Sequence, residues 1–149
     1  MTFKEKIVQQ YHQLLCDRII LLNNALDDLR ESSKNETKSS AGDKYETARA
    51  MLQLEQDKIN KQLGEAREQK ALFEQIDFSK KHVQIRKGSL AKTRNTYLLV
   101  SLALAKIFVD GITVIALSPQ SPLGIKLIGL KENDTAEING TKYFIESVE

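Results

Sequence analysis

Two carboxylates three residues apart, Asp43 and Glu46, are the residues whose type and spacing most directly suggest chemistry. They lie in the polar stretch SSAGDKYET, residues 39–47, between two long segments with helical periodicity. Mg²⁺ in proteins commonly takes one or two carboxylates and leaves its other positions to water and phosphate. Two acids at the tip of a long arm could therefore complete a metal site inside another macromolecule, where the metal assists attack on phosphate.

The same spacing also has a purely structural interpretation. An Asp that caps a helix, with a Glu three residues later, forms a capping box, and acids favour the positive end of the helix dipole. A capping box also orients its acidic side chains, so the two interpretations are compatible. The sequence leaves both open.

Other catalytic or metal-binding sets are missing from the sequence. His12 and His82 are the only histidines and Cys16 is the only cysteine, so neither a His/Cys metal set nor a Ser–His–Asp arrangement can be assembled. His12 lies on the apolar stripe of the first helix and is interpreted as a packed or partly solvated core residue. We therefore expect a chain that is not an enzyme by itself and has no cofactor of its own.

The sequence also predicts a cytoplasmic protein without a membrane segment. A lone cysteine cannot form an intramolecular disulfide, which fits a reducing compartment. The N-terminus has acids and amides where a signal peptide needs an apolar run. The most apolar region, which begins at Thr96, is interrupted by Lys106 and Asp110, and so falls short of the roughly 20 apolar residues that a spanning helix needs.

The elements that would position the two acids are a pair of helices. From Phe3 to about Glu31 there is no Pro or Gly, and apolar residues recur with 4-3 spacing. This stripe consists of Val8, His12, Leu15, Ile19, Leu22, Leu26 and Leu29. A second seven-residue series consists of Tyr45, Leu52, Ile59, Ala66 and Phe73. Because the connection is short and polar, the helices are predicted to form an antiparallel coiled-coil hairpin over residues 1–78, with its acidic tip near 39–47.

After residue 78 the pattern changes to a small, mostly antiparallel α+β domain over residues 79–149. Strands are predicted in HVQIR, TYLLVS, KIFV and ITVIAL, and a short helix between Pro122 and Gly129. Asn139-Gly140 is the preferred two-residue hairpin turn, and its register sets Glu137 opposite Lys142 and Ala136 opposite Tyr143.

Charge is unevenly distributed along the chain. The formal net charge is only +2, but residues 78–109 contain seven Lys or Arg residues and no acid. This basic run is either a solvated face of the sheet or a surface that faces a docking partner or nucleic acid, in which case association would be salt-sensitive.

Two stretches resemble the Gre transcript cleavage factors of bacterial RNA polymerase. GDKYETA, residues 42–48, is similar to the family's tip sequence GDLSENA, and the matching residues are Gly42, Asp43, Glu46 and Ala48. The stretch from Ser121, SPLGIKLIGLKENDTAEINGTKYFIESV, resembles the family's C-terminal signature. The matching residues there are Ser121, Pro122, Leu127, Gly129, Lys131 and Asp134.

The resemblance implies an FKBP-like C-terminal domain that docks on RNA polymerase beside its secondary channel. The docking residues would be Ser121, Pro122, Leu123 and Gly124. The hairpin would enter the channel, where Asp43 and Glu46 would act in trans as catalytic residues and hold Mg²⁺ shared with the polymerase, so that backtracked RNA is cut. The implied partners are RNA polymerase and, indirectly, the nascent RNA and the DNA, with the factor itself a monomer.

Departures from the family pattern define an alternative. Lys44 and Tyr45 stand between the acids, and Arg49 occupies a position where the family has an acid. Lys44 and Arg49 place positive charge beside a prospective cation site. The alternative is therefore a regulator that binds the secondary channel without stimulating cleavage.

Two further functions remain open. A peptidyl-prolyl isomerase would need an aromatic pocket, for which the domain offers Tyr97, Phe108, Tyr143 and Phe144. A plain coiled-coil interaction module would use the two tip acids only as a helix cap.

Overall fold

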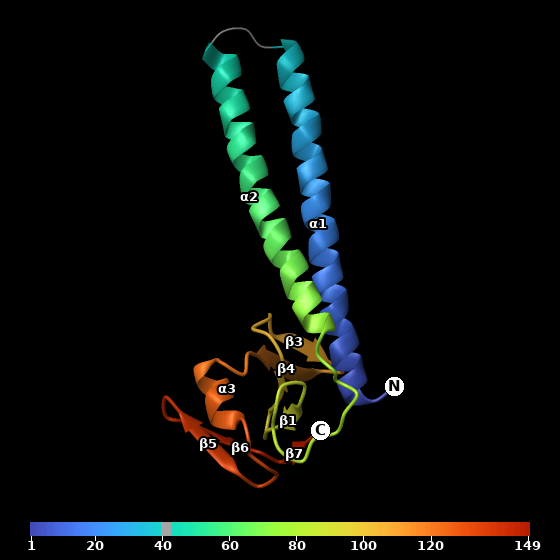
Figure 1. The fold of residues 1–149 in the computed structure, drawn as a ribbon, viewed down its shortest axis with the longest axis vertical. Coiled ribbons are helices and arrows are strands. Elements are labelled where there is room, and N and C mark those ends of the chain that lie inside the picture. Colours follow the sequence, from blue (N-terminus) through green and yellow to red (C-terminus); the bar gives the residue numbers. More distant parts are fainter. Residues whose placement is uncertain (40–42) are drawn as a thin grey trace. The chain divides into compact units, whose positions relative to one another are not determined.

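The computed structural model describes the backbone of residues 1–39 and 43–149, and the side chains of residues 1–34 and 46–149. The chain is a long N-terminal helical hairpin followed by a mostly antiparallel β domain (Figure 1). It divides into two compact units: unit 1 comprises Met1–His12 and Leu72–Glu149, and unit 2 comprises Gln13–Ala71. These units are defined by packing, whereas the predicted boundary near residues 77–81 remains a prediction from the sequence.

The hairpin consists of α1 (Phe3–Ser39) and α2 (Asp43–Glu74). The helix prediction is confirmed, but the predicted end of the first helix near Glu31 is wrong, because α1 continues to Ser39. Residues 32–39 contain neither Gly nor Pro, so nothing in them forces the helix to stop. The predicted connection, SSKNETKSSAG, covers residues 32–42, and its last three residues, 40–42, lie outside the described residues.

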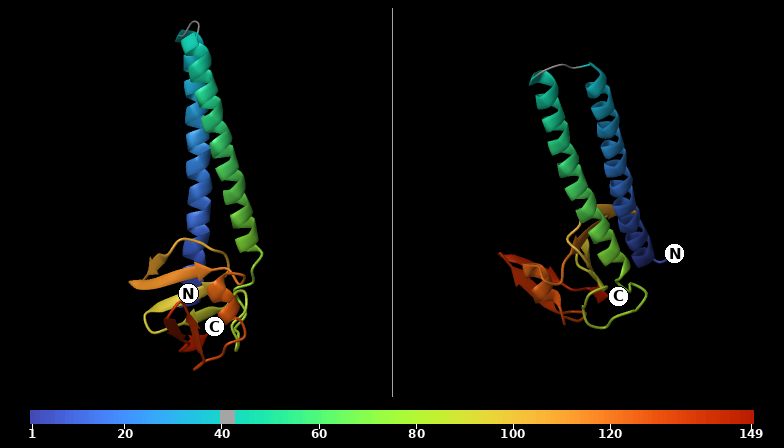
Figure 2. Two further views of the ribbon diagram at one scale, coloured as in Figure 1. Left: turned by 90° about the vertical axis from the view of Figure 1, so that its left-hand side faces the viewer. Right: turned by 45° about the horizontal axis from the view of Figure 1, so that its top comes forward.

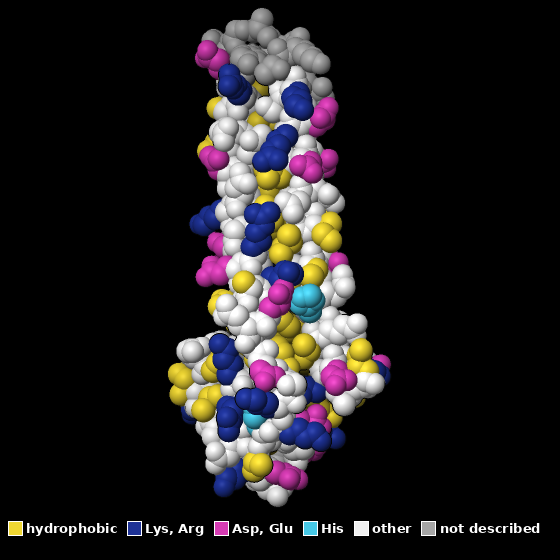
Figure 3. Space-filling model, turned by 45° about the vertical axis from the view of Figure 1, so that its right-hand side comes forward, with side chains coloured by type: hydrophobic (Ala, Val, Ile, Leu, Met, Phe, Trp, Pro, Cys, Tyr) yellow, Lys and Arg dark blue, Asp and Glu magenta, His cyan; other side chains and the backbone are white. Residues whose placement is uncertain are grey.

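The predicted apolar stripe holds unit 2 together. Leu15, Leu26 and Ala66 of the predicted series are buried, as is Leu63, which neither series included, and the other described stripe residues of α1 are at least half-buried. Arg18 donates a hydrogen bond across the hairpin to Gln69 Oε1 at 3.2 Å. Figure 3 shows apolar side chains along the seam between the two helices, with charged side chains on either side.

Unit 1 is built around a five-stranded sheet of order β3-β4-β2-β1-β7. Its strands are β1 (Leu90–Lys92), β2 (Thr96–Val100), β3 (Ile107–Val109), β4 (Ile112–Leu117) and β7 (Ser147–Val148). Neighbouring strands are antiparallel except β2 and β4, which are parallel. The helix α3 (Pro122–Leu127) and the hairpin of β5 (Thr135–Ile138) and β6 (Thr141–Phe144) complete the unit, and Figure 2 gives two further views of it.

The two faces of this sheet are covered by different elements. On one face, Leu98, Val100 and Leu117 pack with Leu127 of α3 and Ala136 of β5 in a single apolar core. The other face carries Tyr97 and Val114 and meets the first turns of α1. There Ile7 and Tyr11 are fully buried and the ring of Phe3 lies 4.8 Å from that of Tyr97.

Tyr11 fixes α1 to this second face. Its hydroxyl donates a hydrogen bond to the main-chain oxygen of Ala105 at 2.8 Å. Burial raises the pKa of Tyr11 to about 12, because the phenolate would be poorly solvated there. The N-terminal turns of α1 are therefore part of the core of unit 1, which the coiled-coil stripe alone did not predict.

The predicted β-hairpin of β5 and β6 is confirmed residue by residue, whereas the strand predicted in HVQIR, residues 82–86, is wrong. Glu137 lies opposite Lys142 and Ala136 opposite Tyr143, and Asn139 and Gly140 both have positive φ. The segment 82–86 forms no strand: it contributes a single bridge between Gln84 and Lys131, and the amide of Ile85 donates to the main-chain oxygen of Leu130.

Candidate functional site

The predicted tip residues lie at the start of α2. The helix begins at Asp43, the position from which the sequence predicts it to open, and Glu46 follows in the first turn with an exposed side chain. Residues three apart on a helix share a face, so the backbone places the two acids on one side of the helix start. The side chain of Asp43 lies outside the described residues.

The start of α1 shows what this spacing does when it serves only as a cap. The amide of Thr2 donates to Glu5 Oε2 at 2.9 Å, and the amide of Glu5 donates to Thr2 Oγ1 at 3.1 Å. This reciprocal pair is a capping box. The corresponding hydrogen bonds of Asp43 and Glu46 are outside the described residues, so both interpretations of the tip stay open.

The donor chemistry of the tip fits a hard divalent cation. Carboxylate oxygens are the ligands that Mg²⁺ takes, and it keeps several further positions for ligands from elsewhere. Among the described residues, no three His, Cys, Asp or Glu side chains are grouped so that they could hold a metal. Asp43 and Glu46 would thus form a partial ligand set.

The predicted docking residues form the N-terminus of α3. Ser121 is the N-cap: its Oγ accepts from the amide of Gly124 at 3.0 Å and donates to the main-chain oxygen of Ser118 at 2.7 Å. Pro122 occupies the first turn and is exposed, and Leu123 packs against the apolar core. Local structure therefore accounts for Ser121, while Pro122 faces solvent.

Gly124 is explained by the same turn. A Cβ added at this residue would lie 2.0 Å from the main-chain oxygen of Ser118 and 2.9 Å from Ser121 Oγ. No side chain fits at that distance. The Ser-Pro-x-Gly pattern thus encodes a tight helix start, in addition to whatever surface it presents.

The aromatic residues considered for an isomerase pocket do not come together. Tyr97 packs on Phe3 on one face of the sheet, whereas Tyr143 packs against the core on the other. Phe108 on β3 is 60% exposed, and Phe144 points to the side of β6 opposite to Tyr143. The arrangement gives no support to an aromatic-lined isomerase site.

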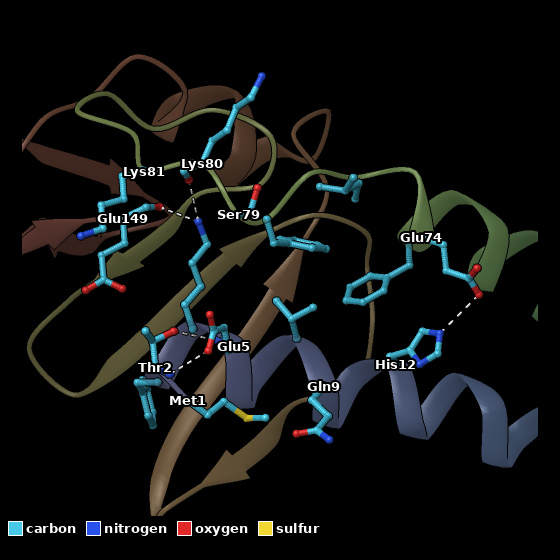
Figure 4. Close-up of a pocket in the computed structure, with 16 residues that line it drawn as sticks. Met1, Thr2, Glu5, Gln9, His12, Glu74, Ser79, Lys80, Lys81 and Glu149 are labelled. Carbon is cyan, nitrogen blue, oxygen red and sulfur yellow. Dashed lines mark hydrogen bonds and ion pairs between the residues drawn. The ribbon is translucent and has the colours of Figure 1, made fainter.

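Unit 1 contains a pocket of about 720 Å³ that the sequence did not predict (Figure 4). Its lining comes from the first turns of α1, the end of α2, residues 76–81 and Glu149. At one end His12 Nε2 lies 3.3 Å from Glu74 Oε1, and the His12 side chain is 44% exposed. This position agrees with a partly solvated core histidine.

Lys4 is the buried cation of this pocket, at 7% exposure. Its ammonium donates to the main-chain oxygens of Lys80 at 3.2 Å and Glu149 at 3.1 Å. Burial lowers the pKa of Lys4, and the negative charges of Glu149 and Asp77 oppose that effect. Sequence analysis missed Lys4 because its two acceptors lie 76 and 145 residues away along the chain.

Comparison with known proteins adds little to this description. No protein-family model and no curated protein match the chain. A solved structure titled "Structure of the transcription factor Gfh1" is similar at 13% identity over 92% of each chain, with a TM-score of 0.36. A likeness of this degree bears on neither the site nor the function. Within the described residues, no helix is long and apolar enough to cross a membrane.

Proposed function

We propose that this chain is a transcription elongation factor that binds RNA polymerase through the secondary channel and stimulates cleavage of backtracked RNA. The observation that carries the proposal is a long helical hairpin whose second helix opens at Asp43, with Glu46 exposed in its first turn. The order of a hairpin followed by a mostly antiparallel β domain supports it, as does the resemblance of GDKYETA and the Ser121 stretch to Gre factors.

In this proposal the chain is not an enzyme by itself. Asp43 and Glu46 would hold Mg²⁺ shared with the polymerase, and the bound ion would lower the pKa of a water and stabilise charge on the phosphate. The role of the chain's own residues is to bring two carboxylates to the polymerase active centre at the end of a preformed arm. α1 is 37 residues long, which corresponds to about 55 Å of helix.

The docking surface would be the exposed side of α3. Ser121 and Gly124 are engaged within the turn, so the exposed apolar side chains of α3 are Pro122 and Ile125, the latter 65% exposed. A Pro122→Ser/Ile125→Ser variant should therefore weaken binding to the polymerase while leaving the cap of α3 in place.

The decisive experiment is RNA cleavage in stalled, backtracked elongation complexes of the cognate polymerase, with wild type compared to Asp43→Asn/Glu46→Gln. Asn is as good a helix cap as Asp, and Gln replaces Glu in a capping box. The variant therefore keeps the helix start and removes only the two charges. We expect cleavage with wild type and a return to the level of polymerase alone with the variant.

A matched control is available on the same helix. Glu65 and Glu68 are also acids three residues apart on α2, and both are exposed. Glu65→Gln/Glu68→Gln removes the same charge away from the tip and should cleave like wild type. Equal cleavage by the tip variant and this control would contradict the proposal and leave Asp43 and Glu46 as a helix cap.

The positive charge beside the acids favours a second candidate, a channel-binding regulator without cleavage activity. Arg49 is exposed one turn beyond Glu46, and Lys44 adjoins Asp43. Such a factor would shift the rate of elongation without cutting RNA. If the positive charge of Arg49 is what prevents cleavage, Arg49→Glu should make cleavage detectable. Wild type that cuts efficiently would exclude this candidate.

A further inference from the structure

A second pocket in unit 1, of about 330 Å³, is lined by basic side chains. Lys80, Arg86 and Lys87 border it together with the ring of His82, and Asp77 is the one acid of the lining. Its volume falls within the range of small-ligand sites. Figure 3 shows Lys and Arg side chains gathered around a histidine on this part of the molecule.

A buried serine fixes the histidine and the arginine of this pocket. Ser89 is fully buried, and its Oγ accepts from the amide of Arg86 at 2.9 Å and lies 2.7 Å from His82 Nδ1. The hydroxyl can donate to Nδ1 or accept from it, according to the tautomer of the ring. In either case Ser89 engages Nδ1, and Nε2 is the ring nitrogen that it leaves for a ligand.

Gly88 allows the turn that carries Arg86 and Lys87 to pack closely against the segment that carries Lys80. The amide of Ser89 donates to the main-chain oxygen of Arg86 at 2.9 Å, closing a tight turn in which Gly88 has φ of 94°. A Cβ on Gly88 would lie 2.9 Å from the main-chain oxygen of Asp77. Gly88 is needed both for this φ and for the close approach, so the turn carrying Arg86 and Lys87 is held directly against the segment carrying Lys80.

The charges of the pocket are unbalanced. Among the residues with described side chains, no carboxylate forms an ion pair with Lys80, Arg86 or Lys87. The carboxylate of Asp77 already accepts hydrogen bonds from the amide and the hydroxyl of Ser79. A concave site with three cations and a single carboxylate is suited to an anion with multiple acceptor oxygens.

We propose that this pocket binds a phosphate group, with Arg86, Lys87 and Lys80 as charged ligands and His82 as an additional donor. The shared chemistry is a phosphate with several free oxygens, which a free oligophosphate or the backbone of a nucleic acid can supply. The inference is independent of the hairpin tip and of RNA polymerase.

The protonation of His82 provides an internal reporter. Burial lowers its pKa, and the positive charges of Lys4, Arg86 and Lys80 lower it further, against a smaller opposite effect of Asp77. A phosphate bound in the pocket would favour the imidazolium and raise this pKa. A purely structural histidine would not respond to phosphate.

The test is an NMR titration of the full chain with sodium pyrophosphate, against sodium chloride at matched ionic strength. We expect saturable shifts of the Gly88 amide and the His82 ring, together with a rise in the pKa of His82. Arg86→Gln/Lys87→Gln should weaken binding by about tenfold or more, the equivalent of one charge-assisted hydrogen bond. The matched control Arg94→Gln/Lys106→Gln removes two charges from the same basic run outside the pocket, and should change binding by less than about twofold.

A parallel titration with a single-stranded RNA of about 12 nucleotides distinguishes the two sources of phosphate. Binding of pyrophosphate but not of RNA would assign the site to a free oligophosphate. RNA binding that weakens in the pocket variant but not in the control would assign it to a nucleic-acid backbone. Saturation by neither probe, or an equal loss in both variants, would overturn the proposal.

Discussion

Replacing Gly124 with Ala tests whether the Ser-Pro-x-Gly pattern exists for the fold. The added Cβ would lie 2.0 Å from the main-chain oxygen of Ser118, where ordinary contact begins at 3.4 Å. That oxygen must then move by the difference, about 1.4 Å. It currently accepts from the amide of Ser121 at 3.1 Å and from Ser121 Oγ at 2.7 Å, so the shift would break the hydrogen bonds that start α3.

The cost follows from these contacts. Overpacking a filled site costs about 1–3 kcal/mol, and each lost hydrogen bond adds about 1 kcal/mol. We therefore expect Gly124→Ala to lower the free energy of unfolding of unit 1 by about 3 kcal/mol or more, a large share of a total of about 5–15 kcal/mol. In urea the midpoint should fall by about 2 M.

The assay is urea unfolding followed by two signals. Near-UV circular dichroism of tyrosine reports chiefly on unit 1, which contains Tyr11, Tyr97 and Tyr143, while far-UV circular dichroism reports on the helices. The control is Gly64→Ala in the interior of α2, where a Cβ meets nothing within 4 Å. Removing this helical glycine should stabilise α2 by about 1 kcal/mol.

A Gly124→Ala protein within about 1 kcal/mol of wild type would refute this reasoning. If that variant also lost affinity for its partner, Gly124 would be a docking residue and not a packing residue. Loss of stability with retained affinity in the folded fraction would place the docking surface elsewhere on α3.

Two further substitutions test the core of unit 1. His82→Asn should flatten the pH dependence of stability. The pKa of His82 in the folded chain is lowered from 6.5, so its contribution to stability is fully present above pH 6.5. This contribution is lost as the pH falls from 6.5 through the folded-state pKa, because in that range the unfolded chain takes up the proton more readily than the folded chain. Thermal unfolding across this pH range measures the effect, and parallel curves for both proteins would contradict it. Tyr11→Phe removes the 2.8 Å hydrogen bond to Ala105 and should cost about 1 kcal/mol in urea unfolding. An unchanged midpoint would show that this hydrogen bond adds no net stability.

The elements that could be predicted from the sequence are those fixed by local chemistry. Asn139-Gly140 sets its own turn and thereby the register of β5 and β6, and Pro122 and Gly129 bound α3 as expected. The apolar stripe of α1 is likewise a local pattern. Each of these follows from residues within a few positions of one another.

The elements that were missed depend on distant partners. HVQIR has the alternation of a strand, but Val83 is 79% exposed, and the backbone of Ile85 pairs with Gly129 and Leu130 at the end of α3. The strand β1 has an unremarkable composition and is defined by pairing with β2 and β7 on either side. In both cases the conformation depends on pairing with distant segments, which the local sequence does not indicate.

Candidate functional residues differ in whether their polar atoms are already engaged by the fold. Ser121 Oγ and Ser89 Oγ each have a main-chain amide as donor and a second partner nearby, so folding alone explains them. Arg86 and Lys87, by contrast, are held in place by their backbone while their charged groups form no ion pair among the described side chains. Asp77 is the one carboxylate in a lining that holds three cations, and folding alone supplies no reason for this excess of positive charge. A bound anion would supply one, and the phosphate titration tests this directly.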